Sequence, residues 1–568
     1  MIDFTAHVAT RLRRLATGTA GETSQRDPIP GSAQVPNAAG GYAWRASDWQ
    51  RLDRFLLLGT AGGTFYAGER ELTREAAAAV ERCLTADGPR VVARAAEVSE
   101  AGRAPSNDPA LFVLAMAAGL GDQATRAAAL LALPRVARTG THLFHWLRYV
   151  RAFRGWGRGV RRAVGRWYQA RTPAELAYQL TKYARRDGWA HRDALRLAHP
   201  APPTATHALL FRYALRGWDG LRGATAGTTL AGADVAEPLD DRVLARLGAV
   251  QAVRAASPEG AARIIREQGL VREEVPTALL RHAAVWEALL PGMPLGALVR
   301  SLGVLTKVGL VAAGSDAARL AADRLADRAA LRRARVHPVA LLSAMKVYAS
   351  GRGVRGRGAW AAAPEVVDAL DAAFYLAFAA APATGRRLLL ALDVSGSMMT
   401  PAHGLPHVSC REASAAMALV TAATEPRHRF VAFTNGPYPS MHSGVGYGSG
   451  LTELAVSPRQ RLDDVLRLAD ALPFGGTDCA LPMVVALERG WKVDAFVVYT
   501  DSETWAGAVH PAQALRRYRE RTGIAAKLVV VAMASSGFTI ADPEDGGMLD
   551  VVGFDAAVPE VLAQFVSA

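Results

Sequence analysis

The sequence predicts a multidomain protein in which an α-solenoid is followed by a doubly wound α/β domain. Before about residue 385 no strand-like alternation stands out, and Pro and Gly residues separate segments of helix length. From Arg386 onward, short continuous apolar runs alternate with helical segments, which is typical of a parallel sheet covered on both faces. Charge changes at the same place, since residues 1–384 hold 51 Lys+Arg against 33 Asp+Glu, and residues 385–568 hold 15 against 19. The basic first part is suited to a polyanion, and the second part is expected to have another task.

The chain is long enough, at 568 residues, for two or more domains with sizeable cores. Residues 1–40 are rich in Gly, Pro, Thr and Ala and are expected to form a mobile N-terminal arm. From about Asp48, apolar residues recur at helical spacing, which indicates antiparallel helix pairs stacked in irregular repeats. The predicted domains are therefore 1–40, 41–384 and 385–568.

The stretch from 141 to 220 is the most basic part of the chain. It holds 15 Lys+Arg and 4 Asp+Glu, and aromatic side chains alternate with the cations. Cations neutralise phosphates, and aromatic faces stack on bases, so the stretch suggests an RNA-binding surface built on helices. The alternative is a solvated basic face whose aromatic residues belong to the core.

One helix in this stretch can be described closely. Residues 172–175 have the form of a capping box with Pro at the first helical position, and Gly188 suits a left-handed helix C-cap. The flank of this helix and the junction after it are expected to form an exposed cationic corner, made of Gln179, Lys182, Arg186, Trp189 and His191. Such a corner can hold phosphates and an unstacked base.

The second part of the chain is expected to alternate strands with helices. Strands are predicted in 388–394, 430–433, 495–499, 528–533 and 551–554, and helices near 411–424, 459–471, 479–490, 511–521 and 556–566. Ligands of such sheets bind beyond the carboxyl ends of the strands.

Oxygen-bearing side chains follow two of these strands. The first strand ends in Asp393-x-Ser395-x-Ser397, a later one is followed by Asp501, and Thr477 lies on a glycine-formed loop between them. These are hard oxygen ligands, which suit Mg²⁺ and not a thiolate zinc site. Two carboxylates leave coordination positions open for water or for a carboxylate of a partner protein. The alternative is a set of serine-rich loops with incidental carboxylates.

This constellation has the pattern of a metal-ion-dependent adhesion site, and residues 386–568 resemble a von Willebrand factor A (vWA) domain. The resemblance implies a doubly wound sheet that binds Mg²⁺ at its top. The ligands it implies are Asp393, Ser395, Ser397, Thr477 and Asp501.

The first part contains several long motifs in order, among them GGYAWRASDWQRLDRFLLLG, GRAPSNDPALF, RTGTHLFHWLRYVRAFRGWGRGVRRAVGRWY, LAYQLTKYARRDGWAHRDALRLAHP and RVHPVALLSAMKVYASGRG. Together they resemble the TROVE module, and the whole chain from about Gly40 is similar to Ro ribonucleoproteins. The resemblance implies a ring of HEAT-like repeats with a basic central hole, closed by the vWA domain. It also implies binding of small noncoding Y RNAs on the outer surface and of single-stranded 3′ ends of misfolded RNAs in the hole. The expected role is RNA quality control or decay, with polynucleotide phosphorylase as a partner.

The RNA contacts implied by the resemblance are carried over onto this sequence. The surface for Y RNA should include Lys182, Arg186 and His191, and Arg185 compensates for Ala184 where the family often has Arg. The basic candidates for either the outer surface or the hole are Arg148, Arg151, Arg154, Arg158, Arg161 and Arg162.

An enzyme is not expected, because no phosphate-binding loop, nucleophile elbow, HExxH motif or paired-carboxylate pocket is recognisable. The serious alternative to RNA binding is a Mg²⁺-dependent vWA scaffold for protein partners, although a pure scaffold would not need so basic a first part. Three widely spaced cysteines, no apolar leader and no run of membrane-spanning length lead us to expect a cytoplasmic monomer that does not contact membranes.

Overall fold

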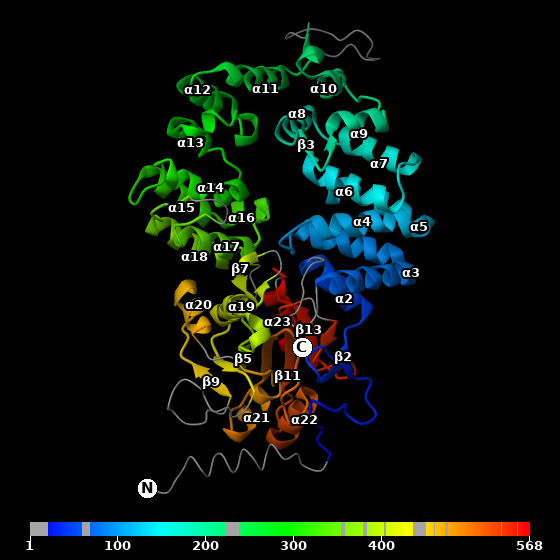
Figure 1. The fold of residues 1–568 in the computed structure, drawn as a ribbon, viewed down its shortest axis with the longest axis vertical. Helices are drawn as coiled ribbons and strands as arrows, with labels where there is room; N and C mark the ends of the chain where they lie inside the picture. The colour runs from blue at the N-terminus through cyan, green and yellow to red at the C-terminus, as the bar shows by residue number, and fades with distance from the viewer. Residues whose placement is uncertain are drawn as a thin grey trace. The chain divides into compact units, whose positions relative to one another are not determined.

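The computed structural model describes most of the chain, namely residues 21–58, 69–222, 238–353, 358–378, 383–402, 405–435, 450–458, 460–471, 475–534, 537–553 and 555–568. It divides into two compact units (Figure 1). The α/β unit comprises Met1–Val80 and Phe378–Ala568, and the helical unit comprises Glu81–Ala377. The predicted order of a helical part and an α/β part is confirmed.

The α/β unit is built on a six-stranded sheet in the order β13-β11-β10-β5-β8-β9. Its strands are β5 (Leu388–Asp393), β8 (His428–Phe433), β9 (Leu451–Leu454), β10 (Ala495–Thr500), β11 (Lys527–Ala532) and β13 (Met548–Val552). All neighbouring pairs are parallel except β8 and β9, which are antiparallel. Every residue of β5 and β10 is buried, which explains why these strands read as continuous apolar runs. The edge strand β9 was not predicted.

Helices cover both faces of this sheet, as a doubly wound fold requires. They are α19 (Cys410–Thr424), α20 (Leu462–Asp470), α21 (Leu481–Glu488), α22 (Pro511–Thr522) and α23 (Val558–Ser567), and each matches a predicted segment. Phe496 and Val498 of β10 share a core cluster with Leu515 and Tyr518 of α22. Tyr499 faces the opposite way, and its hydroxyl lies 3.0 Å from Thr421 Oγ1 of α19. A pair of short strands, β6 (Pro401–Ala402) and β7 (Leu405–Ser409), precedes α19.

The N-terminal segment is part of the α/β unit, which contradicts the predicted mobile arm and the domain boundary at residue 41. Strands β1 (Val35–Pro36) and β2 (Tyr42–Arg45) form a small sheet with β12 (Phe538–Thr539). After β2, helix α2 (Asp48–Leu58) is fixed by an ion pair of 2.8 Å between Arg54 and Asp550, whose side chains are both 2% exposed. Residues 1–20 of the predicted arm lie outside the described residues.

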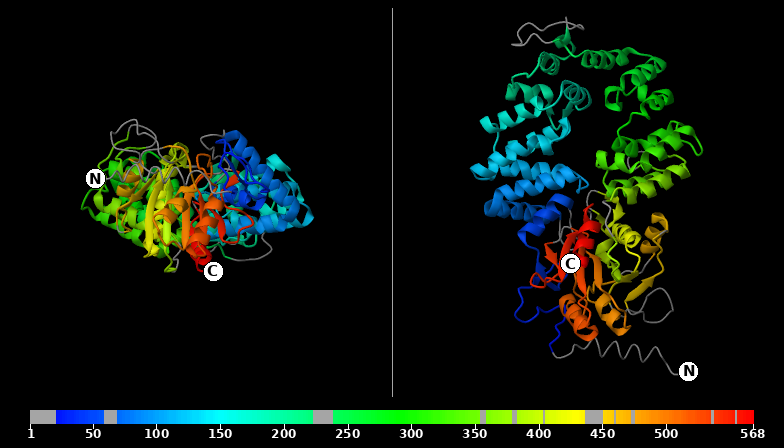
Figure 2. Two further views of the ribbon diagram at one scale, coloured as in Figure 1. Left: turned by 90° about the horizontal axis from the view of Figure 1, so that it is seen from below. Right: turned by 180° about the vertical axis from the view of Figure 1, so that it is seen from behind.

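The helical unit consists of helices that pack on their neighbours in sequence. They are the part of α3 (Glu69–Ala101) from Glu81 onward, α4 (Asp108–Leu120), α5 (Gln123–Val136), α6 (Gly140–Phe153), α7 (Arg158–Gln169), α8 (Pro173–Lys182), α9 (His191–Ala198), α10 (Ala205–Arg216), α11 (Asp241–Ala252), α12 (Pro258–Gln268), α13 (Ala283–Leu289), α14 (Leu295–Lys307), α15 (Asp316–Ala326), α16 (Arg328–Ala334), α17 (Pro338–Ala349) and α18 (Pro364–Leu376). Short 3₁₀ turns lie at Gly217–Leu221, Val253–Ala255, Arg272–Glu274 and Leu279–Arg281, and one in the α/β unit at Gly396–Met399. The views in Figure 2 follow the succession of these helices from two further sides.

Local chemistry sets the helix boundaries. Side-chain oxygens of Asp122, Thr139, Thr172 and Thr204 accept hydrogen bonds from first-turn backbone amides, which satisfies donors that have no partner inside a helix. Helix α3 is interrupted at Asp87 (φ −157°, ψ 79°), where Gly and Pro follow in the sequence.

The two ends of the helical unit contact each other. Arg335, which follows α16, donates from Nε to the carbonyl oxygen of Glu100 in α3 at 2.7 Å. His337 Nε2 lies 2.9 Å from the carbonyl oxygen of Arg103. The succession of helices in this unit therefore returns to its starting point.

Two sequence expectations concern the environment of the chain. The described helices include none with the length and apolarity to cross a lipid bilayer. Cys83, Cys410 and Cys479 are buried free thiols.

Candidate functional site

A β-hairpin carries the arginines that follow α8. The predicted capping box is confirmed, since the Thr172 hydroxyl accepts from Glu175 N (3.3 Å) and the Glu175 carboxylate accepts from Thr172 N (2.9 Å). The helix ends at Lys182, however, and β3 (Arg185–Arg186) pairs with β4 (Trp189–Ala190). Between them, Asp187 (φ 50°) and Gly188 (φ 78°) make a two-residue turn of left-handed residues. The prediction that Gly188 caps the helix is wrong.

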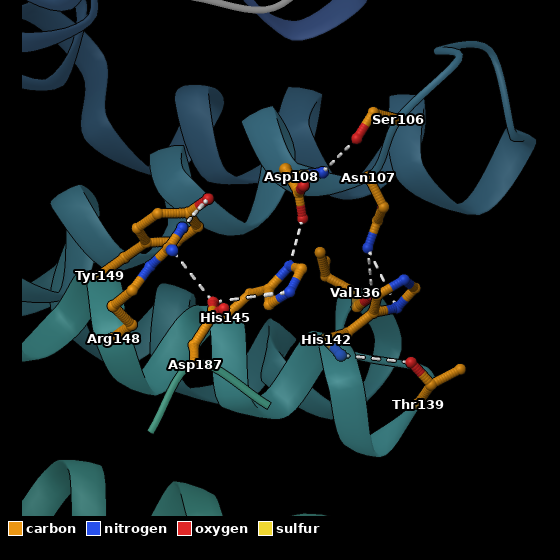
Figure 3. A network of polar contacts seen from close by, with 10 residues as sticks. All are labelled: Ser106, Asn107, Asp108, Val136, Thr139, His142, His145, Arg148, Tyr149 and Asp187. Atoms are coloured by element: carbon orange, nitrogen blue, oxygen red, sulfur yellow. Dashed lines mark hydrogen bonds and ion pairs between the residues drawn. The ribbon is translucent and has the colours of Figure 1, made fainter. Parts of the chain in front are cut away.

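A network of charged side chains fastens this turn to α6 (Figure 3). Asp187 Oδ2 lies 3.1 Å from Arg148 Nη1 and 3.6 Å from His145 Nε2. On its other side, His145 donates from Nδ1 to Asp108 Oδ1 at 2.6 Å. Burial favours the neutral form of Asp108, but the hydrogen bond from His145 and the nearby charges of His145, His142 and Arg148 together outweigh it and hold the pKa of that carboxyl below its usual value. Contacts from Asp187 to His145 of α6, and from His145 to Asp108 of α4, thereby connect the hairpin to both helices.

The hairpin presents cations to solvent. Arg185 and Arg186 are exposed, and neither has an acidic partner within the part of the chain that the structure describes. Lys182 Nζ donates to the Tyr178 hydroxyl at 2.6 Å and lies over the rings of Tyr178 and Tyr183. An amine held by hydroxyl and ring contacts keeps its full charge available to a phosphate.

A second group of cations lies beside the hairpin, on α6 and α7 and in the loop between them. Its members are exposed and form no ion pair with any described residue: Arg151, Arg154, Arg158, Arg161 and Arg162. Trp156 of this loop stacks on Trp189 of β4, with ring centroids 6.4 Å apart, so the loop and the hairpin adjoin. We use the name hairpin surface for the predicted cations that the structure gathers here: Arg148, Arg151, Arg154, Arg158, Arg161, Arg162, Lys182, Arg185 and Arg186.

His191 is the exception among the predicted RNA contacts. Its side chain is interior, only 3% exposed, and both ring nitrogens are engaged, by the Tyr168 hydroxyl at 2.8 Å and the Gln179 carbonyl oxygen at 3.2 Å. Burial lowers the pKa of His191 to about 4, so the ring is neutral. The prediction that His191 lies at the exposed corner and contacts RNA is wrong. Gln179 is buried as well, where its side chain accepts from Gly140 N at 2.8 Å.

The predicted metal ligands meet at the carboxyl edge of the large sheet. Strands β5 and β10 are parallel neighbours, which puts Asp393 beside Asp501 at that edge. Asp393 accepts hydrogen bonds from Ser395 N (2.9 Å) and Thr500 Oγ1 (2.7 Å), and the hydroxyls of Ser395 and Ser397 are 3.1 Å apart. A backbone bond of 3.2 Å from Gly396 N to the Gly475 carbonyl oxygen joins the loop that carries Thr477.

The chemistry of these residues fits a small divalent cation. The five side chains are at most 2% exposed, and Thr477 Oγ1 is buried without a hydrogen-bond partner among the described residues. Burial, helped by the charge of Asp501, raises the pKa of Asp393 to about 7, and burial also raises the pKa of Asp501. Two carboxylates buried close together repel each other, and a cation between them would lower the cost of burying their charges. Nowhere in the described ranges do three Asp, Glu, His or Cys side chains gather as a metal site, so hydroxyl oxygens must complete the set.

No pattern in the sequence predicts the residues of the N-terminal segment that support this edge. Glu503 accepts hydrogen bonds from the backbone amides of Ala38 (3.0 Å) and Ala39 (3.3 Å). Gln25 is fully buried and donates from Nε2 to Asp478 Oδ1 (2.7 Å) and to the carbonyl oxygen of Val509 (2.8 Å). A lone Gln in a Gly- and Pro-rich stretch has no pattern that would reveal such contacts.

The chain is similar to known proteins along nearly all of its length. A family model of the TROVE domain matches residues 35–220 and 246–347, and one of the Ro60 vWA domain matches residues 387–566. The chain is 42% identical over 535 residues to the RNA-binding protein RO60 of Deinococcus radiodurans, which covers 94% of this chain and 95% of that protein. It is 35% identical over 599 residues to the RNA-binding protein RO60 of Caenorhabditis elegans, with 94% and 90% covered.

A solved structure agrees with these similarities. The crystal structure of the Deinococcus radiodurans RO (RSR) protein matches with a TM-score of 0.66 and 40% sequence identity, over 92% of this chain and 99% of that one. Because both domain models match in order and the relatives extend over nine-tenths of the sequence, the chain belongs to the Ro family, with a TROVE domain followed by a Ro60-type vWA domain.

Proposed function

We propose that this Ro protein binds a structured, Y-like small noncoding RNA through its hairpin surface. The observation that carries the proposal is the set of exposed arginines there that have no acidic partner among the residues the structure describes, Arg185 and Arg186 above all. A cation that is not neutralised by the protein can displace the counter-ions of an RNA phosphate, and this release favours binding. The names of the curated relatives, which are RNA-binding proteins, point the same way.

The geometry of the hairpin suits a structured RNA. Asp187 and Gly188 fix the turn, and the contacts of Asp187 with Arg148 and His145 prevent the hairpin from moving away from α6. A rigid row of cations loses little conformational entropy when it meets a phosphate backbone of fixed spacing. The partly exposed Trp156 and Trp189 beside it offer ring faces to an unpaired base.

Two further parts of the proposal rest on the family resemblance. Single-stranded 3′ ends of misfolded RNAs would enter a basic hole of the helical unit, and the arginines of α6 and α7 are divided between that hole and the outer surface. The protein would act in RNA quality control or decay in the cytoplasm, without catalysing a reaction itself, and polynucleotide phosphorylase is the expected partner.

The carboxyl edge of the sheet is proposed to hold Mg²⁺. Asp393 and Asp501 would supply charge, and Ser395, Ser397 and Thr477 would supply hydroxyl oxygens, which leaves Mg²⁺ able to accept a carboxylate of an acidic protein ligand. The buried Thr477 Oγ1, which has no hydrogen-bond partner in the described part of the chain, supports this assignment. The same edge supports the second candidate function, a Mg²⁺-dependent scaffold for protein partners with no RNA role.

One experiment separates the two functions. Arg185→Gln with Arg186→Gln removes two hairpin cations, and Arg332→Gln with Arg333→Gln removes two exposed cations from α16 of the same unit. We expect the double variant Arg185→Gln, Arg186→Gln to bind a stem–loop RNA about 10- to 100-fold more weakly than wild type. The slope of log K against the logarithm of salt concentration should become shallower by about 2. The α16 pair should change affinity by less than about 3-fold, as measured by fluorescence anisotropy over a salt series. Equal effects of the two pairs, or wild-type binding that is flat across the salt series, would refute the RNA proposal and leave the scaffold.

A further inference from the structure

A polar cavity lies where the two ends of the helical unit meet. Its volume is about 300 Å³, at the lower end of the range for small-molecule pockets. We call it the seam pocket, and its polar lining residues are Ser99, Ser106, Asn107, Arg138, Thr139, His142 and Arg335. No Asp or Glu is among the residues that line it. It is therefore a cationic cavity, formed by residues of α3, α4 and α6 at one end of the unit and of α16 at the other.

Arg335 is held in this wall at an energetic cost. It has a left-handed backbone (φ 48°, ψ 45°) at the end of α16, a position that usually takes Gly or Asn. A non-glycine residue in this conformation has a strained backbone. The aliphatic part of the Arg335 side chain packs against Gly102. A Cβ atom added at Gly102 would lie 3.0 to 3.2 Å from the Cβ, Cγ and Cδ atoms of Arg335. Both features keep the guanidinium at the seam.

Arg138 is the second cation of the pocket and is only partly compensated. Its Nη1 donates to the backbone oxygen of Ser99 (3.0 Å) and to Ser99 Oγ (2.6 Å), and it forms no ion pair with a described residue. Burial, together with the charge of Arg335, lowers the pKa of Arg138 to about 10, so it still carries its proton at neutral pH. The carboxylate of Glu100 interacts electrostatically with both Arg138 and Arg335. It already accepts two hydrogen bonds from Arg135, however, at 2.6 and 2.7 Å.

Two helices also begin at this cavity. Asn107 precedes α4 and Thr139 precedes α6, helices of 13 and 14 residues, and both residues line the pocket. The N-terminal ends of helices carry partial positive charge and favour anions. The Asn107 side chain makes no capping bond to α4, since it donates to the Val136 carbonyl oxygen at 3.0 Å and accepts from Ser99 Oγ at 2.6 Å. The positive ends of two helices thus add to the two guanidinium groups.

We propose that the seam pocket binds a phosphate group, with Arg138 and Arg335 as its counter-ions and the hydroxyls of Ser106 and Thr139 as further donors. Phosphate is the anion whose several oxygens match a pocket of guanidinium and hydroxyl donors. Its source is either a free mononucleotide or the terminal phosphate of an RNA strand. Since Arg335 comes from the opposite end of the helical unit from Arg138, a phosphate between them stabilises the contact of the two ends. This site goes beyond the proposed RNA binding at the hairpin surface.

The test uses isothermal titration calorimetry on the full chain in chloride buffer. The probes are inorganic phosphate, adenosine monophosphate, and a hexauridylate with either a 3′-phosphate or a 3′-hydroxyl. Arg138→Gln and Arg335→Gly each remove one guanidinium, and glycine suits the left-handed backbone at 335. Arg332→Gln is the control, because it removes an exposed cation three residues away on the same helix.

We expect the wild type to bind a phosphate-bearing probe, Arg138→Gln and Arg335→Gly to weaken that binding at least about 10-fold, and Arg332→Gln to change it less than 2-fold. Binding of adenosine monophosphate and inorganic phosphate identifies a free nucleotide as the source, and binding only of the 3′-phosphorylated strand identifies an RNA end. Failure of all four probes to bind, or an equal loss in Arg332→Gln, overturns the proposal. If Arg138→Gln does not fold, Arg335→Gly alone decides, because phosphate should raise the thermal midpoint of the wild type and not of that variant. Affinity of Arg335→Gly for the stem–loop RNA should stay within 2-fold of wild type, so the two proposals fail independently.

Discussion

At the scale of single residues, His191 shows how a side chain can serve a surface without being part of it. A carbonyl oxygen only accepts, so Nε2 donates to Gln179, and Nδ1 accepts from the Tyr168 hydroxyl. One neutral tautomer satisfies both bonds beneath the hairpin. Gly140 packs so closely that a Cβ there would lie 3.0 Å from His191 Nε2. The ring therefore positions the start of α9 and the strand before it.

This arrangement makes stability depend on pH. The folded pKa of His191, about 4, lies below the ordinary value of 6.5, so the unfolded chain binds more protons between these values. Stability should be complete above pH 6.5 and fall as pH drops to 4, by up to roughly 3 kcal/mol from this residue. His191→Gln should be less stable than wild type at pH 7 but lose less stability over this window. Urea unfolding followed by tryptophan fluorescence measures the free energy of unfolding of both proteins across this pH range. Parallel plots of that free energy against pH would contradict the role of His191 as a buried neutral ring.

Gln25 has the same kind of supporting role in the α/β unit. Its side chain contacts Asp478, Thr504 and the backbone of Gly507 and Val509, all near the proposed metal ligands. Gln25→Ala leaves these buried groups without partners and should lower the free energy of unfolding by about 2–4 kcal/mol. The matched change Gln564→Ala, at an exposed glutamine of α23, should cost less than about 0.5 kcal/mol. Equal denaturation midpoints for the two variants would show that the N-terminal segment is not fixed by Gln25.

At the scale of elements, the hairpin between α8 and α9 is the part that sequence reasoning described least well. An Asp-Gly pair is a strong signal for a two-residue hairpin turn, but the flanking strands hold only two residues each. Strands so short lack the alternation that identifies a strand, so the sequence pattern favours a helix end at Gly188 instead. The capping box at Thr172 was predictable, because its signal lies within four consecutive residues.

The role of the hairpin turn in RNA binding can be tested by the substitution Gly188→Ala, which adds a single methyl group. Gly188 (φ +78°) and Gly490 (φ +65°) both have left-handed backbones, and a Cβ at either position would meet no atom within 4 Å. Alanine should therefore cost about 1 kcal/mol of stability at both sites, through backbone strain alone. Only Gly188→Ala should also weaken binding of the stem–loop RNA, by about 3- to 10-fold, because it disturbs the turn that aligns Arg185 and Arg186. Anisotropy titrations of both variants check this, and unchanged affinity of Gly188→Ala would mean that the turn does not organise the RNA surface.

At the scale of the whole molecule, the sequence established the order of the parts but not the first boundary. Periodicity and charge separate a helical part from an α/β part, because both properties are averages over many residues. Residues 21–58 were misassigned because their partners, such as Gly507 and Asp550, are more than 450 positions away. Contacts at that separation leave no local pattern in the chain. That Asp393 and Asp501 would converge at one edge of the sheet could be predicted, because the fold class itself brings the ends of parallel strands together.

The proposed RNA surface and the proposed metal site lie in different units of the chain. Asp393 lies in the α/β unit and the hairpin surface in the helical unit, so changes at one should not alter the other. Millimolar Mg²⁺ should raise the thermal midpoint of the wild type by several degrees, because a ligand that binds only the folded state stabilises it. Asp393→Asn should abolish this shift while leaving affinity for the stem–loop RNA within 2-fold of wild type, with or without EDTA. Differential scanning fluorimetry and anisotropy on the same samples measure the two effects, and loss of RNA affinity in a folded Asp393→Asn protein would show that the metal edge takes part in RNA binding.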